Sequence, residues 1–198
     1  MDGSKKWVMP AFGVMGLLFA TGTAVPASGS SDSTIADSQT HLHQYPRAGS
    51  QSGLDRNARM LAAHNAERHR LRLEPLKWSN RLEREAKEWA RHLSRKGVLQ
   101  HADLDMRNGT GENLWMGTAG HWPVETMVAK FLEEKQHYKH AHFPHNSKTG
   151  NWADVGHYTQ IVWRETREVG CALATDLGSD ILVCRYWPAG NVWGRKAY

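Results

Sequence analysis

The sequence predicts an α+β domain between residues 54 and 198. Three segments with apolar residues at helical spacing come first, and three segments rich in β-branched and aromatic residues come last. Helices followed by strands are typical of α+β folds. A segment of this length is also close to the common size of one domain with its own core.

Two patterns precede this domain. Lys5 and Lys6 are followed by a largely apolar run over residues 7–25 and then by small residues. This order predicts a secretory signal peptide over residues 1–27, with an uncleaved membrane anchor as the alternative. Residues 28–53 are rich in Ser, Thr, Asp, Gln and Gly, and we expect a disordered linker there because little of it can be buried.

Composition narrows the location and the partners. No later segment approaches the roughly 20 consecutive apolar residues of a membrane-spanning helix, so no transmembrane span is expected after signal cleavage. The net charge is +5, but basic residues are interspersed with acidic ones, and a nucleic-acid partner is not expected. We expect a secreted monomer, in the periplasm or outside the cell.

The first helix is predicted over residues 54–70. Apolar and small residues recur there at helical spacing, which predicts the side of the helix that is buried. The predicted buried face consists of Leu54, Ala58, Leu61, Ala62 and Asn65.

The second helix is predicted to begin after Asn80 and to end at Gly97. Asn80 is a favourable N-cap, and Glu83 three residues later would complete a capping box. Its inward-facing residues are predicted to be Leu82, Ala86, Trp89, Ala90 and Leu93.

The third helix is predicted from Pro123 to about His140, since proline is favoured at the first helical position. Glu134 falls on its apolar stripe, where a carboxylate needs a partner or must reach water. Between the second and third helices, residues 111–115 are predicted to form a glycine-bracketed loop that carries Glu112.

Three strands are predicted over residues 157–164, 168–175 and 181–187. The last two flank a turn, and a hairpin centred on Leu177 and Gly178 places Cys171 directly opposite Cys184. An exported protein meets an oxidising compartment, so we expect these cysteines to form a disulfide, with two free buried thiols as the alternative.

Histidines and carboxylates are the residues to consider for a site, because both bind metals or transfer protons near neutral pH. His157 opens a predicted strand, and His101 follows the second helix. Taken singly, each of the four candidate residues has an ordinary explanation. His157 could be a surface histidine and His101 a histidine that caps a helix. Glu112 could be a solvated loop glutamate and Glu134 a glutamate at the boundary of the core.

Four separate segments resemble one family. Residues 156–163 (GHYTQIVW) and 181–192 (ILVCRYWPAGNV) resemble the two signatures of the CAP superfamily, which comprises cysteine-rich secretory proteins, antigen 5 and pathogenesis-related proteins. Residues 111–114 (GENL) and 64–68 (HNAER) are similar to two further blocks. The resemblance covers about residues 54–193, and with only one cysteine pair the chain looks like a bacterial-type secreted member.

This resemblance implies an α-β-α sandwich with a small antiparallel sheet between helices. It also implies a cleft lined by a tetrad of two histidines and two glutamates, which by motif matching are His101, Glu112, Glu134 and His157. His64, in contrast, is expected to serve helix packing.

The implied cofactor is Zn²⁺ or another divalent metal, with His101 and His157 as ligands. The expected function is a secreted binding module for a lipid or sterol, a peptide or a cell-envelope ligand. The alternative is a zinc-dependent hydrolase, peptidase or esterase-like, with Glu112 or Glu134 as a catalytic general base. A purely structural role stays open, and so does the question of whether the protein is an enzyme.

Overall fold

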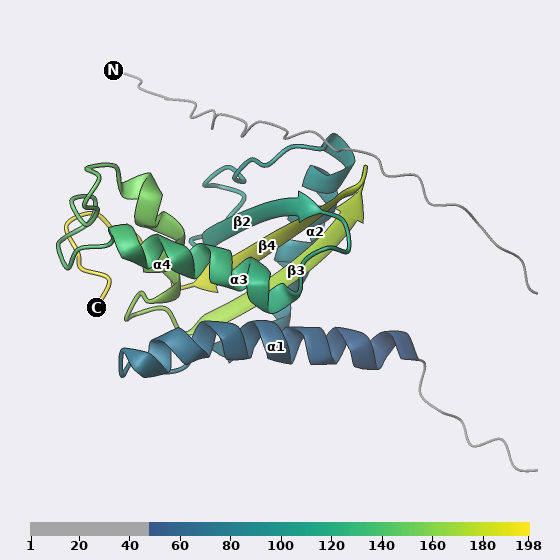
Figure 1. Ribbon diagram of the computed structural model, residues 1–198, viewed down its shortest axis with the longest axis horizontal. Coiled ribbons are helices and arrows are strands. Elements are labelled where there is room, and N and C mark those ends of the chain that lie inside the picture. Colours follow the sequence, from purple (N-terminus) through teal and green to yellow (C-terminus); the bar gives the residue numbers. More distant parts are fainter. Residues whose placement is uncertain (1–47) are drawn as a thin grey trace, which may run out of the picture. The chain divides into compact units, whose positions relative to one another are not determined.

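The structure is a computed structural model that describes residues 48–198 (Figure 1), with side chains from Asp55 onward. The predicted signal peptide and most of the predicted linker lie outside these residues. The last six linker residues, 48–53, instead form the start of the first helix, which begins earlier than predicted. Among the described residues, no helix combines the length and the apolar content that crossing a membrane requires.

The centre of the domain is a four-stranded mixed sheet with the strand order β1-β3-β4-β2. Strands β2 and β3 both pair antiparallel with β4, whereas the short β1 pairs parallel with β3. The strands are β1 (Lys77–Trp78), β2 (Gly111–Thr118), β3 (Glu168–Asp176) and β4 (Ser179–Trp187). The parallel β1 makes the sheet mixed and not purely antiparallel as predicted.

Helices cover both faces of this sheet (Figure 1). Along β4, Leu182 and Cys184 face a large core built with three of the helices, while Ile181 and Val183 face a smaller core under the fourth. The first three are α1 (Ala48–Arg70), α3 (Val124–Glu133) and α4 (Gly156–Ile161), and the fourth is α2 (Asn80–Lys96). This alternation in β4 confirms the predicted α-β-α sandwich.

The β3–β4 hairpin is confirmed with its predicted register. Leu177 and Gly178 form its turn with φ angles of 48° and 76°, the positive values that a tight two-residue turn between antiparallel strands needs. Cys171 lies opposite Cys184, and the two sulfurs form a disulfide. Both cysteines are buried and face the large core.

The buried face of α1 differs from the predicted one. Ala58 and Ala62 are exposed, and the fully or almost fully buried residues are Met60, His64, Glu67 and Arg68. Three of these four are polar, so a pattern of apolar residues could not identify this face.

Helix α2 is confirmed over Asn80–Lys96, and Gly97 ends it with a φ of 62°. The cap, however, is Ser79, and the predicted capping box does not form. The Glu83 carboxylate instead accepts a hydrogen bond from the indole nitrogen of Trp78, at 2.9 Å.

Helix α3 ends earlier than predicted. It stops at Glu133, a short 3₁₀ turn η1 (Glu134–His137) follows, and Tyr138 is already extended and pairs with Ser147. The ring of Tyr138 packs against those of Tyr158 and Tyr198, which holds the chain away from a helical path.

Two further predictions are wrong. Residues 157–164 do not form a strand: η2 (Trp152–Val155) leads into helix α4. The side-chain hydroxyl of Thr159 donates to the carbonyl of Val155, four residues earlier, as threonine hydroxyls do in helices. Residues 111–115, predicted as a loop, begin strand β2. A side chain at Gly111 would force the buried Gln160 side chain on α4 to move, because a Cβ atom would lie 1.9 Å from its Oε1.

Candidate functional site

The first histidine–glutamate pair joins the segment after α2 to strand β2. Nδ1 of His101 lies 2.7 Å from Oε1 of Glu112, and the same oxygen accepts the backbone N–H of Ala102 at 3.0 Å. The histidine side chain is 45% exposed, whereas that of Glu112 is fully buried. Glu112 therefore contacts the imidazole from the buried side, while the His101 ring reaches solvent.

Arg185 balances the charge of the buried glutamate. It lies opposite Glu112 in the β2–β4 register, and its guanidinium nitrogen is 3.0 Å from Oε2. Burial lowers the pKa of Arg185, and the negative charge of Glu112 partly opposes that shift. The two charges are thus paired inside the protein, as buried charges need to be.

The second pair joins η1 to helix α4. Nδ1 of His157 lies 2.5 Å from Oε1 of Glu134, while Oε2 accepts the backbone N–H groups of His157 at 2.9 Å and Tyr158 at 3.1 Å. These amides have no partner within their own helix, so the carboxylate also caps α4. Phe131 stacks against the His157 ring, with centroids 5.0 Å apart.

A hydrogen-bond chain links the two pairs to the core. Asn113, next to Glu112 on β2, donates its amide to the backbone oxygen of His157 at 3.0 Å and to the hydroxyl of Tyr186 at 3.2 Å. That hydroxyl also lies 2.9 Å from Nε2 of His64. Both pairs are therefore anchored at the junction of β2 and α4.

The structure brings the four tetrad residues into two hydrogen-bonded pairs. In the part of the chain that it describes, no three tetrad residues offer ligand atoms within 4.8 Å of one another. His64, Cys171 and Cys184 meet that distance, but both sulfurs belong to the disulfide and are not available as thiolate ligands.

The pairing fixes which nitrogen of each imidazole can bind a metal. A carboxylate can only accept, so in the neutral tautomer that fits this contact Nδ1 of His101 and of His157 carries the proton and Nε2 is the nitrogen with a lone pair. The side chain of His157 is 23% exposed and that of Glu134 19%. A carboxylate behind a histidine is the usual support of a metal-binding imidazole.

Sequence reasoning missed Arg185 and Asn113. Arg185 lies on the same face of β4 as Ile181 and Val183, which pack in the small core. A charged residue at a position where the alternating pattern predicts an apolar one could have identified Arg185 from the sequence. Asn113 directly follows Glu112 in a segment predicted as a loop, and nothing local distinguishes its role.

Comparisons with known sequences agree with this architecture. A family model described as "Cysteine-rich secretory protein family" (CAP) matches residues 61–186. Pathogenesis-related protein 1C of Nicotiana tabacum is 36% identical over 140 residues, covering 70% of this chain and 78% of its own length. Golgi-associated plant pathogenesis-related protein 1 of Homo sapiens is 33% identical over 135 residues, covering 67% of this chain and 82% of its own length.

Solved structures share the fold. A structure titled "Crystal structure of NaASP2 with Zn2+" aligns with a TM-score of 0.61 at 23% identity, over 71% of this chain and 83% of that one. The structure of BmVAL-1 aligns with a TM-score of 0.53 at 27% identity, over 63% of this chain and 64% of that one. The plant and human relatives give no support to a bacterial-type assignment. The family match and these relatives show that the chain belongs to the CAP family of cysteine-rich secretory proteins.

Proposed function

We propose that the protein is an exported binding module that holds a divalent metal ion, Zn²⁺ in the first instance, through Nε2 of His101 and His157. The observation that carries the proposal is the carboxylate behind each imidazole, which orients the ring and leaves Nε2 free. A lipid, a peptide or an envelope polymer would then bind beside the metal.

The donor set fits zinc as a partial site. Two imidazoles supply two of the four ligands that Zn²⁺ prefers, and water or a bound ligand would complete the set. The metal would supply an electrophilic centre for an oxygen of the ligand. Glu112 and Glu134 orient the two histidines, and the guanidinium of Arg185 pairs with the buried Glu112 carboxylate.

Binding has more support than hydrolysis. A general base must be free to take a proton from water. The Glu112 carboxylate is buried with three partners, and Glu134 accepts from one imidazole and two backbone amides. A zinc-dependent hydrolase would have to give up contacts that hold α4 and β2 in place.

The test is zinc binding by the purified protein, measured by calorimetry and by metal content. His101→Ala and His157→Ala should each weaken zinc binding, and Glu112→Gln or Glu134→Gln should weaken it about 10- to 100-fold. His69→Ala, which removes an exposed imidazole elsewhere, is the matched control. Zinc bound equally well by the His101→Ala, His157→Ala double variant would refute the site.

A second assay separates binding from turnover. We expect no hydrolysis of peptide or ester substrates by the zinc-loaded protein. Turnover that a chelator abolishes and zinc restores, and that Glu112→Gln or Glu134→Gln removes, would instead establish the hydrolase.

A further inference from the structure

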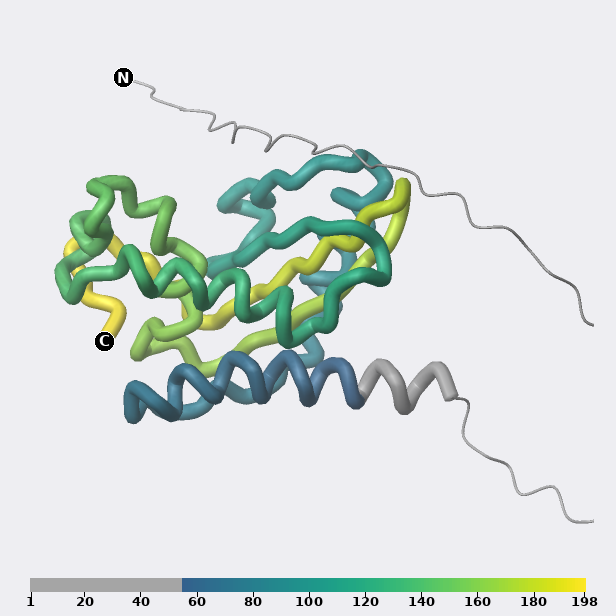
Figure 2. Tube along the Cα trace, viewed as in Figure 1, coloured from purple at the N-terminus to yellow at the C-terminus, as the bar shows by residue number. Residues whose placement is uncertain are grey.

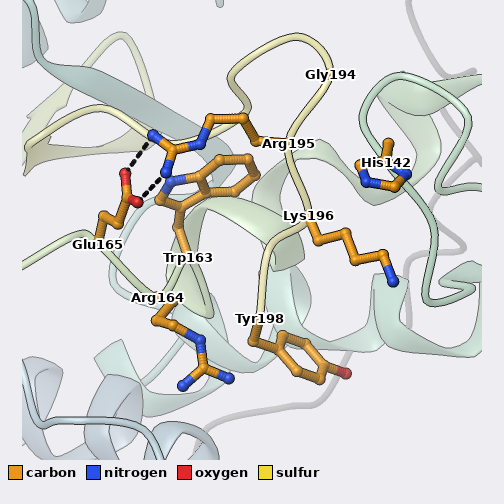
Figure 3. Close-up of a pocket in the computed structure, with 8 residues that line it drawn as sticks. All are labelled: His142, Trp163, Arg164, Glu165, Gly194, Arg195, Lys196 and Tyr198. Carbon is orange, nitrogen blue, oxygen red and sulfur yellow. Dashed lines mark hydrogen bonds and ion pairs between the residues drawn. The ribbon is translucent and has the colours of Figure 1, made fainter.

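A depression of about 380 Å³ lies between the turn that follows α4 and residues 194–198 (Figure 3), and no tetrad residue lines it. Its walls include several long charged side chains. Those that matter for binding are His142, Arg164, Glu165, Arg195 and Lys196, around the indole of Trp163.

The backbone around this depression is fixed by hydrogen bonds. The amide of Arg164 donates to the carbonyl of Ala197 at 2.6 Å, and the amide of Phe143 donates to that of Arg195 at 2.8 Å. Figure 2 shows residues 194–198 beside the segments around Phe143 and Arg164, to which they are hydrogen-bonded. Trp163 is buried, and its carbonyl accepts from the guanidinium of buried Arg68 at 2.8 Å.

The charges in the depression do not cancel. Glu165 and Arg195 neutralise each other in a two-bond ion pair, visible as dashed lines in Figure 3. Arg164 and Lys196 are both exposed, and no acidic group of residues 55–198 lies within ion-pair distance of either. Figure 3 shows them on either side of the Tyr198 ring. Two positive charges are therefore left without a partner.

The neighbouring residues add to the positive potential. Burial, together with the charges of Arg167 and Arg164, lowers the pKa of Arg68 to about 10, and the charge of Glu74 opposes this shift. An anion near Arg164 would relieve this repulsion.

We propose that this depression binds a phosphate group, held by the guanidinium of Arg164 and the ammonium of Lys196, with an imidazole N–H of His142 as a further donor. A phosphate carries up to two negative charges and so matches the two unpaired cations. A planar guanidinium and a flexible ammonium are the common pair of phosphate donors in proteins. Both side chains are long and exposed, and both line the same depression.

The experiment is calorimetric titration of the metal-free, full-length protein with inorganic phosphate at low ionic strength, where surface charges are least screened. We expect one binding site. Arg164→Gln with Lys196→Gln should weaken it at least about tenfold, since each charge-assisted contact contributes about that factor. Arg164 contributes to the fold through its backbone amide and carbonyl, and among residues 55–198 neither of the two side chains makes a hydrogen bond or ion pair, so this variant should remain folded.

Three variants control the result. Arg84→Gln with Lys87→Gln removes the same charges from the exposed face of α2 and should leave phosphate binding unchanged. Glu165→Gln should tighten binding, because it removes the negative charge of a side chain that lines the depression and releases Arg195. His101→Ala with His157→Ala should bind phosphate as the unmodified protein does.

The source of the phosphate is decided with two further probes. Glycerol 1-phosphate represents a soluble ligand, and vesicles of phosphatidylcholine with phosphatidylglycerol represent a lipid headgroup. Loss of binding to either probe in the Arg164→Gln, Lys196→Gln variant supports the site. No phosphate binding, equal weakening in the α2 control, or phosphate binding that the double variant retains would overturn the proposal.

Discussion

His64 is a fully buried imidazole with a partner on each ring nitrogen. Nδ1 lies 2.7 Å from the carbonyl of Met60, which can only accept, so Nδ1 carries the proton. Nε2 is then the acceptor for the hydroxyl of Tyr186. This single ring thus joins α1 to β4 and, through Asn113, to the candidate site.

The pH dependence of stability follows from this burial. Desolvation is the main cause that lowers the pKa of His64 from 6.5 to about 4. The hydrogen bond to the Met60 carbonyl opposes the shift, and the charge of Arg68 contributes to it. The unfolded chain takes up a proton below pH 6.5 and the folded protein only below about 4, so stability falls as the pH drops through this window. We expect His64 to account for roughly 3 kcal/mol of that loss.

Chemical denaturation between pH 7 and pH 4 measures this effect. His64→Gln should flatten the pH dependence of the unfolding free energy, whereas His69→Gln, at an exposed position, should retain it. An unchanged slope in His64→Gln would show that other groups cause the loss.

At the scale of elements, the packing of α2 on β3 depends on a missing side chain. A Cβ atom at Gly170 would lie 2.3 Å from the backbone nitrogen of Glu83 and 2.7 Å from the carbonyl carbon of Leu82. Backbone atoms cannot rotate away, so the helix and the strand would have to separate.

Gly170→Ala should therefore lower the unfolding free energy by about 3 kcal/mol or more, read from denaturation curves. Gly156→Ala is the matched control, because its Cβ would make only an ordinary contact of 3.4 Å with Trp152 at a helical φ of −63°. The control should stay within about 1 kcal/mol of the unmodified protein. Equal stability of both variants would contradict this account of the α2–β3 contact.

Regular amphipathic patterns allowed α2, β3 and β4 to be predicted. The position of the hairpin turn predicted the register in which β3 pairs with β4. The same reasoning failed for α4, since a short apolar run with alternating polar residues fits a helix or a strand equally well. Pattern reasoning failed for β2 because Gly111 and Gly117 suggest a loop. In the structure these glycines lie within the strand, where a Cβ atom would meet the side chain of Gln160 or Trp115.

The four site residues followed from the family resemblance, but their pairing did not. Glu134 and His157 are 23 residues apart, and their contact depends on where α3 ends and where α4 begins. Both boundaries are set by tertiary contacts, which local sequence does not record.

At the scale of the whole molecule, the disulfide acts through the unfolded chain. It closes a loop between cysteines 13 residues apart, which reduces the conformational freedom of the denatured state. The native hairpin is already held by its own ladder and turn, so the folded state gains little.

Cys171→Ala with Cys184→Ala should cost about 3 kcal/mol of unfolding free energy while leaving the circular dichroism spectrum unchanged. A reducing agent should destabilise the unmodified protein under unfolding conditions and have no effect on the double variant. A double variant as stable as the disulfide-bonded protein would rule out this entropic contribution.

Glu134 makes the candidate site part of the scaffold, because one carboxylate holds both an imidazole and the first amides of α4. A library of variants selected only for thermal stability, with no metal or ligand present, would therefore keep this glutamate. Evolution could likewise preserve the site through stability alone, and a descendant that had lost its ligand would still carry the residues that once bound it.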